Sequence, residues 1–125
     1  MATIKRFEDI QAWQKARVLV REIYKLSRAG LLRNDFELRR QMCGAAVSSM
    51  SNIAEGFARR TNRDFAHFLD VARGSVAEVQ SLLYVALDAG YISAEHFKKL
   101  FGLAEETASL IGGFTSYLRS GRGPQ

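Results

Sequence analysis

The chain reads Asn52-Ile53-Ala54-Glu55-Gly56-Phe57-Ala58-Arg59-Arg60 at the close of a segment dominated by small residues. From Gly44 to Ala54, most residues are Gly, Ala, Ser or Val. Such a run of small residues lets a neighbouring helix approach closely. Gly is about 1 kcal/mol less favourable than Ala inside a helix. Gly44 is therefore predicted to mark the point of close approach. Gly56 is predicted either to end the helix or to mark a tight contact. We therefore expect a tightly packed helix over residues 35–58.

Outward from this segment, apolar residues recur at helical spacing in three further stretches. The four helices are predicted over residues 8–29, over 35–58, from 61–64 to Gly90, and over 93–120. Short connections make successive helices antiparallel neighbours. The sequence therefore predicts an all-α fold, an antiparallel up-down-up-down four-helix bundle.

Polar residues at the predicted helix starts support these boundaries. Asp35, Thr61 and Ser93 are predicted N-caps, because their side-chain oxygens accept from the free backbone amides of a first turn. Glu8 and Asp9 are expected in the first turn of the first helix, where the helix dipole favours negative charge. We expect Gly30 to stop that helix.

The chain has 125 residues, which predicts one domain. We expect the bundle over 8–120, an N-terminal extension over 1–7 and a disordered tail over 121–125. Cys43 is the one cysteine, so no intrachain disulfide forms, and it is predicted to be a packed core residue. The sequence begins without a secretory signal and holds no apolar run near the roughly 18 residues of a membrane span. These features predict a cytoplasmic protein without a membrane partner.

Charge is divided unevenly between the two halves of the chain. Residues 1–63 hold 13 Lys and Arg against 6 Asp and Glu, a net charge of +7. Residues 64–125 hold 5 against 7, a net charge of −2, and the two halves give the total of +5. A basic surplus confined to one half favours a polyanionic partner such as RNA or DNA.

The candidate nucleic-acid-binding residues belong to this basic half. They are Arg17, Arg21, Lys25 and Arg28 on one face of the first helix, Arg39 and Arg40 on the second, and Arg59, Arg60 and Arg63 at the turn that follows it. Guanidinium groups grip phosphates bidentately. The alternative is an ordinary solvated surface. Aromatic residues in turns, such as Phe36, do not alternate with basic residues as a stacking platform requires.

A second set of polar residues lies on the second and third helices. Its members are Asn52, Glu55 and Arg59 on the second, and Arg73, Ser75 and Glu78 on the third. If the two helices pack antiparallel, these groups are expected to meet, because a carboxylate at a helix seam needs a partner. The network is interpreted either as fixing helix register or subunit contacts, or as a recognition site.

No pattern of catalytic residues is present. A di-iron bundle needs two Glu-x-x-His pairs, whereas this chain offers only Asp64 with His67 at that spacing. Its other histidine, His96, follows Glu95 directly, and neighbouring helical residues do not face each other. Phosphate-loop and dinucleotide glycine patterns are missing. We therefore expect no enzyme activity, no metal site and no cofactor.

Three stretches carry a family resemblance: residues 7–16, with Trp13 followed by Gln14-Lys15-Ala16; residues 52–56; and Gly74-Ser75 with Glu78. Together they resemble the four-helix-bundle proteins of the 23S rRNA intervening-sequence family, over roughly residues 7–118. The family includes an accessory protein of diversity-generating retroelements, a basic pentamer thought to bind nucleic acid and a reverse transcriptase.

This resemblance implies a four-helix bundle that assembles as a homopentameric ring. Two positions depart from the family pattern: Cys43-Gly44 replaces a frequent basic pair, and Met50 replaces a frequent proline. The favoured interpretation is a non-enzymatic homo-oligomer that binds structured RNA or DNA through its basic surface. The alternative is an assembly scaffold or protein-binding module with no nucleic-acid role.

Overall fold

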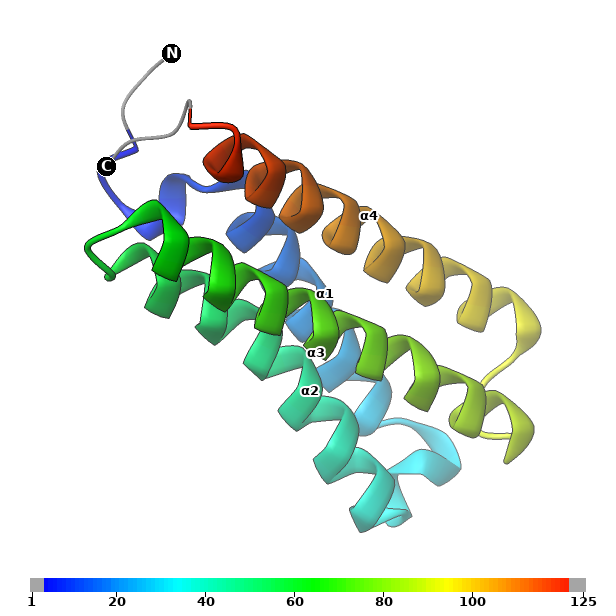
Figure 1. Cartoon of the computed structure of the whole chain (residues 1–125). Helices are drawn as coiled ribbons and strands as arrows, with labels where there is room; N and C mark the ends of the chain where they lie inside the picture. Colours follow the sequence, from blue (N-terminus) through cyan, green and yellow to red (C-terminus); the bar gives the residue numbers. More distant parts are fainter. Residues whose placement is uncertain (1–3, 122–125) are drawn as a thin grey trace.

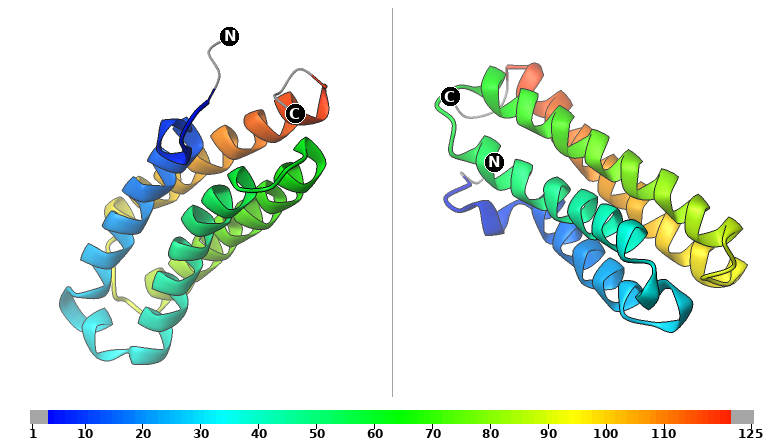
Figure 2. Two further views of the ribbon diagram at one scale, coloured as in Figure 1. Left: turned by 90° about the vertical axis from the view of Figure 1, so that its left-hand side faces the viewer. Right: turned by 90° about the horizontal axis from the view of Figure 1, so that it is seen from below.

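Four α-helices account for most of residues 4–121, the part of the chain that the computed structural model describes. They are α1 (Gln11–Ser27), α2 (Phe36–Phe57), α3 (Asn62–Asp88) and α4 (Ala94–Arg119). Each helix packs against the next, and α4 returns to pack against α1 (Figures 1 and 2). The helices alternate in direction, so the predicted all-α, up-down-up-down bundle is confirmed.

The core is a single cluster of apolar side chains from all four helices. Its largest fully buried helical members include Leu19 and Ile23 from α1, Met42 and Ile53 from α2, Leu69, Val76 and Leu83 from α3, and Leu100 and Ile111 from α4. Burial of these faces is the main stabilising contribution to such a bundle, because isolated helices of this length are marginal in water.

The three predicted N-caps are confirmed. The Asp35 side chain accepts from the Leu38 amide at 3.1 Å, and the Ser93 hydroxyl accepts from the amide of His96 at 3.0 Å. The Thr61 hydroxyl accepts from the amide three residues on at 3.1 Å. These caps fix the starts of α2, α3 and α4.

The start of the first helix differs from the prediction. A separate 3-10 helix, Phe7–Asp9, holds the two acidic residues, and α1 begins only at Gln11. Ile10 between them is extended (φ −77°, ψ 120°) and 2% exposed. The chain breaks its helix here because the break brings Ile10 into the core.

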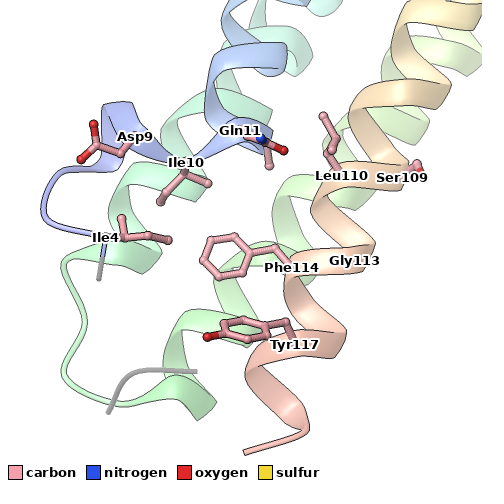
Figure 3. Close-up of a pocket in the computed structure, with 10 residues that line it drawn as sticks. Ile4, Asp9, Ile10, Gln11, Ser109, Leu110, Gly113, Phe114 and Tyr117 are labelled. Atoms are coloured by element: carbon pink, nitrogen blue, oxygen red, sulfur yellow. The ribbon is translucent and has the colours of Figure 1, made fainter. Parts of the chain in front are cut away.

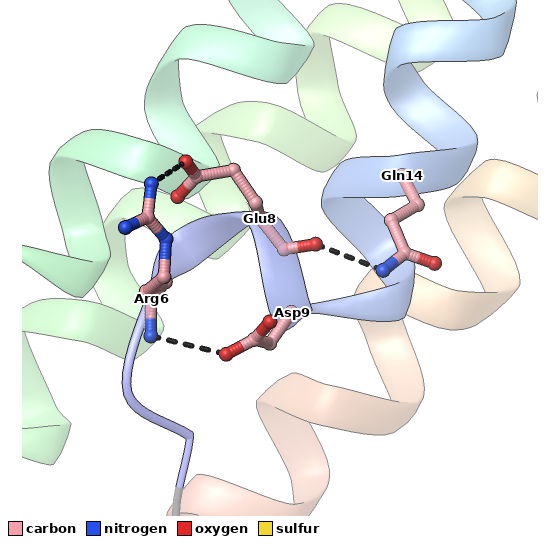
Figure 4. A network of polar contacts seen from close by, with 4 residues as sticks. All are labelled: Arg6, Glu8, Asp9 and Gln14. Carbon is pink, nitrogen blue, oxygen red and sulfur yellow. Dashed lines mark hydrogen bonds and ion pairs between the residues drawn. The ribbon is translucent and has the colours of Figure 1, made fainter.

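Local polar contacts hold the 3-10 turn in place (Figure 4). The Arg6 amide donates to the Asp9 carboxylate at 3.3 Å, and the Arg6 guanidinium contacts Glu8 at 2.6 Å. The Gln14 side chain donates to the Glu8 carbonyl at 2.8 Å, which ties the turn to α1. The hydrogen bond from Arg6 lowers the pKa of Glu8.

The end of the first helix also differs from the prediction. Helix α1 ends at Ser27, and Gly30 does not act as its stop but opens a second 3-10 helix, Gly30–Asn34. Gly30 has φ +56°, a conformation that favours glycine. The turn buries Leu32 completely beneath the connection, which is why the chain coils again before α2.

The close approach of α2 to α3 occurs at Gly56 rather than at Gly44. A methyl group on Gly56 would stand 2.8 Å from both Phe65 Cδ1 and Phe68 Cβ, whereas one on Gly44 would meet nothing within 4 Å. Helix α2 continues through Gly56 to Phe57. The tight-contact interpretation of Gly56 is therefore confirmed, and the packing role predicted for Gly44 is wrong within this chain.

The predicted terminal segments fall largely outside the described residues. Of the extension over 1–7 the structure describes 4–7, and of the tail over 121–125 it describes Gly121 alone. No helix within residues 4–121 combines the length and the apolar character that a bilayer crossing requires.

Candidate nucleic-acid interface

The bundle topology divides the nine predicted basic residues between two ends and one helix face. The α2–α3 turn carries three of them at the end of the bundle where the described chain begins and finishes (Figure 1). Lys25, Arg28, Arg39 and Arg40 lie at the opposite end, on either side of the α1–α2 connection. Arg17 and Arg21 lie between the ends, along α1. The predicted residues therefore form no single cluster.

At the α2–α3 turn, the three arginines have different surroundings. The Arg59 guanidinium lies 4.4 Å from the centre of the Phe68 ring and 3.8 Å from the Glu55 carboxylate. Arg60 and Arg63 are exposed and form no ion pair with another described residue. Arg59 thus contributes to packing, and Arg60 and Arg63 remain available to a phosphate.

Along α1, the predicted basic face is exposed. Arg17 lies 5.8 Å from the centre of the Trp13 ring, and Lys25 pairs with Glu22 at 3.3 Å. Arg17 and Arg21 have no ion-pair partner within residues 4–121, and the same holds for Arg28. Three of the four predicted basic residues on this face, Arg17, Arg21 and Arg28, therefore have no ion-pair partner among the described residues.

At the start of α2, the two arginines are held in position by short contacts. The Arg39 guanidinium donates to the Arg33 carbonyl at 2.8 Å, and Arg40 pairs with Glu37 at 2.9 Å. The pKa of Glu37 is lowered by a hydrogen bond from Gln41 and by Arg40. Arg40 is therefore the more neutralised of the two.

The predicted polar network forms only in part. Ser48 of α2 and Ser75 of α3 are 2.9 Å apart between their hydroxyl oxygens, and Asn52 donates to the Ser48 carbonyl at 2.8 Å. Glu55 turns instead toward Arg59. Ser48 was not singled out in the sequence, although it lies one turn before Asn52. This cluster fixes the register of α2 against α3.

Arg73 and Glu78 lie outside this cluster. The Arg73 guanidinium rests over α4, where a methyl group on Gly112 would stand 3.0 Å from its Nη1 atom. Glu78 is exposed and has no ion-pair partner among the described residues. Neither residue is hydrogen-bonded or ion-paired to Asn52 within residues 4–121, so this part of the predicted network does not form there.

Asn62, at the first position of α3, was missed as a distinctive residue. It is 9% exposed, and its Nδ2 atom is buried without a hydrogen-bond partner. It lines a hollow of about 500 Å³ with Arg63 and Arg119. Asp64 in the same first turn already supplies negative charge to the helix start. This hollow therefore suits a single polar group better than a run of phosphates.

An apolar pocket lies between the N-terminal turn and α4 (Figure 3). Its volume is about 430 Å³, and Ile4, Ile10, Phe114 and Tyr117 point toward it. Its lining holds one carboxylate residue, Asp9, and no Lys, Arg or His. A polyanion would meet no cation in this pocket, so the pocket is unsuited to binding one.

Metal-ligating side chains do not gather in the described part of the chain. Within residues 4–121, no three His, Cys, Asp or Glu residues are grouped so as to hold a metal ion. Cys43 is partly buried rather than fully packed and lies at the edge of the core.

Comparison with known proteins identifies a family for this architecture. The model of the 23S rRNA-intervening sequence protein family matches residues 8–113. A crystal structure of a protein of unknown function, from the S23 ribosomal protein family of Bacteroides thetaiotaomicron, has the same fold. Its TM-score is 0.75 at 20% identity, covering 83% of this chain and 97% of that one. No curated protein matches the chain.

Proposed function

We propose, since the chain belongs to the 23S rRNA-intervening sequence protein family, that it is a non-enzymatic homo-oligomer that binds structured RNA or DNA through its basic surface. The observation that carries the proposal is the set of exposed arginines without an ion-pair partner among the described residues. Five of the predicted basic residues belong to this set: Arg17, Arg21, Arg28, Arg60 and Arg63. Exposed cations that the protein leaves unpaired are free to displace counterions from phosphates.

Self-association is supported by the exposed face of α2 and α3. Val47, Val71 and Val85 are exposed apolar residues on these helices, and a methyl group on Gly44, three residues before Val47, would meet nothing within 4 Å. Exposed apolar side chains on helices are typical of contacts with another subunit. The family resemblance adds the expectation of a pentameric ring.

Charge reversal with a charge-matched control tests nucleic-acid binding. We expect Arg60→Glu/Arg63→Glu to weaken binding of a structured RNA and to reduce the salt dependence of log affinity by about 2, one for each lost phosphate contact. Lys98→Glu/Lys99→Glu on α4 changes the net charge equally and should leave that slope nearly unchanged. Fluorescence anisotropy across a salt series measures both variants. Equal losses in the two would show that only net charge matters.

The alternative is an assembly scaffold or protein-binding module. The apolar pocket of Figure 3 favours it, because such a pocket fits an aliphatic or aromatic side chain of a partner. In this alternative, Arg17 and Arg21 pack against acidic residues of another subunit. An assembled structure with both arginines in open solvent would contradict it.

A further inference from the structure

A groove runs between the end of α1 and the start of α2. Its volume is about 450 Å³, and its lining includes Tyr24 and Arg28 from α1 and Phe36, Arg39 and Arg40 from α2. Three arginines line the groove, and no carboxylate does. Arg40 is paired with Glu37 at 2.9 Å, whereas Arg28 and Arg39 have no ion-pair partner among residues 4–121. The groove thus combines aromatic rings with two arginines whose charge is not neutralised.

The Phe36 ring is unusually exposed. Phe36 is 74% exposed, although it sits at the first position of α2. Two other arginine–aromatic pairs have rings that the bundle covers more fully: Trp13 beneath Arg17 is 8% exposed, and Phe68 beneath Arg59 is partly buried. Packing within the chain therefore does not account for the position of Phe36.

Arg39 orients the exposed ring. Its guanidinium carbon lies 5.7 Å from the centre of the Phe36 ring, and its hydrogen bond to the Arg33 carbonyl holds it there. Most of the ring stays open to solvent. Arg28, across the groove, has no ion-pair partner in residues 4–121. A ligand in the groove would meet an open aromatic face beside free cations.

We propose that this groove binds an unpaired segment of RNA or DNA, with one base stacked on Phe36 and the neighbouring phosphates held by Arg28 and Arg39, the two lining arginines without an ion-pair partner among residues 4–121. This inference rests on the proposed nucleic-acid binding and specifies that the bound nucleic acid is single-stranded. Bases inside a duplex have their faces covered by neighbouring bases, so only an unpaired base can stack on a protein ring. Every base offers such a face, so we expect little sequence preference.

The test uses an oligonucleotide that carries 2-aminopurine, a base whose fluorescence is quenched when it stacks. We expect quenching when the wild-type protein binds the single strand, and none with the same sequence in a blunt duplex. Phe36→Leu should weaken single-strand binding roughly fivefold or more, since loss of base–aromatic stacking has effects of at least that size. Phe36→Tyr should retain both affinity and quenching. RNA and DNA versions of the strand are compared directly.

Leu31→Ala provides the matched control. Leu31 is 66% exposed in the neighbouring connection but does not line the groove, so its loss should leave binding unchanged. Cys43 lines the groove and is the one cysteine of the chain, so its alkylation rate reports on occupancy. We expect bound oligonucleotide to slow that alkylation. Circular dichroism checks that each variant stays helical.

The outcomes separate this proposal from the broader function. If wild-type protein binds neither strand nor duplex at low salt, the proposed function fails and the groove proposal fails with it. If wild type binds nucleic acid but Phe36→Leu binds equally well and Cys43 stays reactive, the groove proposal alone is overturned. If Phe36→Leu dissociates the oligomer but leaves the affinity for the oligonucleotide unchanged, the groove is a contact between subunits, and the groove proposal is also overturned.

Discussion

The two ends of α2 carry the same residue types and use them differently. At its end, Gly56 brings the backbone against Phe65 and Phe68, and Arg59 covers the Phe68 ring. At its start, Arg39 lies beside Phe36, but no other helix closes over that ring. An arginine beside a phenylalanine thus completes the packing at one end and forms a surface at the other.

Whether another helix packs over the ring decides the role of such a pair. After Phe57 the chain reverses within a few residues, so α3 lies directly against the last turn of α2. Before Phe36 the chain passes through the 3-10 helix Gly30–Asn34, whose buried Leu32 fills the gap between α1 and α2. The longer connection leaves the first turn of α2 uncovered on one side.

The largest effect is expected at the packed end. Gly56→Ala should lower the free energy of unfolding by about 2 kcal/mol, because the added methyl forces α3 away from its contact with α2. The nearest atoms include Phe68 Cβ and the Phe65 carbonyl, which move only with the backbone. Urea denaturation measures the change. If Gly56→Ala leaves the free energy of unfolding unchanged or raises it, α3 does not pack tightly against this end of α2.

A smaller loss is expected at the open end. Asp35 caps α2 and also accepts from the Tyr91 hydroxyl at 2.9 Å, so Asp35→Ala removes two contacts. We expect a loss of somewhat more than the roughly 1 kcal/mol of a cap alone. Ser93→Ala, which removes only the cap of α4, is the matched control. Equal losses in the same denaturation experiment would mean that the Tyr91 bond contributes nothing.

A gain is expected at Gly44. Because a methyl group there meets nothing within 4 Å, Gly44→Ala should raise the stability of the isolated chain by roughly 1 kcal/mol through helix propensity. Thermal unfolding at low protein concentration measures it. If the same variant loses oligomer mass in light scattering, Gly44 faces another subunit. A loss of stability in the monomer would contradict the open environment described for it.

The smallest effect concerns pH at the open end. The hydrogen bond to Asp35 raises the pKa of Tyr91 above its ordinary value of 10.0. The bond therefore stabilises the fold fully below pH 10.0 and is lost as pH rises through the higher pKa of the folded state. Tyr91→Phe should show a shallower alkaline fall in melting temperature than wild type. Identical curves would mean that Tyr91 ionises without cost to the fold.

The helices and their caps could be predicted because their signals are local. Asp35, Thr61 and Ser93 each act on a backbone amide three residues away, and the apolar spacing that marks the core is also read within one helix. The first helix was predicted too long at both ends. Its limits depend on Ile10 and Leu32 reaching the core, which is a tertiary effect.

The candidate site could be predicted less well, because it depends on which helix faces are covered. The charge distribution along the sequence indicated the basic half. It could not predict that Arg59 contacts Glu55 and the Phe68 ring while Arg60 has no ion-pair partner among the described residues. The spacing of aromatic and basic residues along the sequence could not predict that Tyr24 and Phe36 line the same groove, because they lie on different helices. The choice between Gly44 and Gly56 likewise required the register of α2 against α3.

The most direct test of a phosphate-binding surface is the affinity of the wild-type protein for an RNA hairpin with a single-stranded overhang, measured across a salt series. We predict that log affinity falls with log salt with a slope of about −3 or steeper, as expected when four or more phosphates are neutralised. An absence of binding even at about 50 mM salt, or a slope near zero, would contradict a phosphate-binding surface.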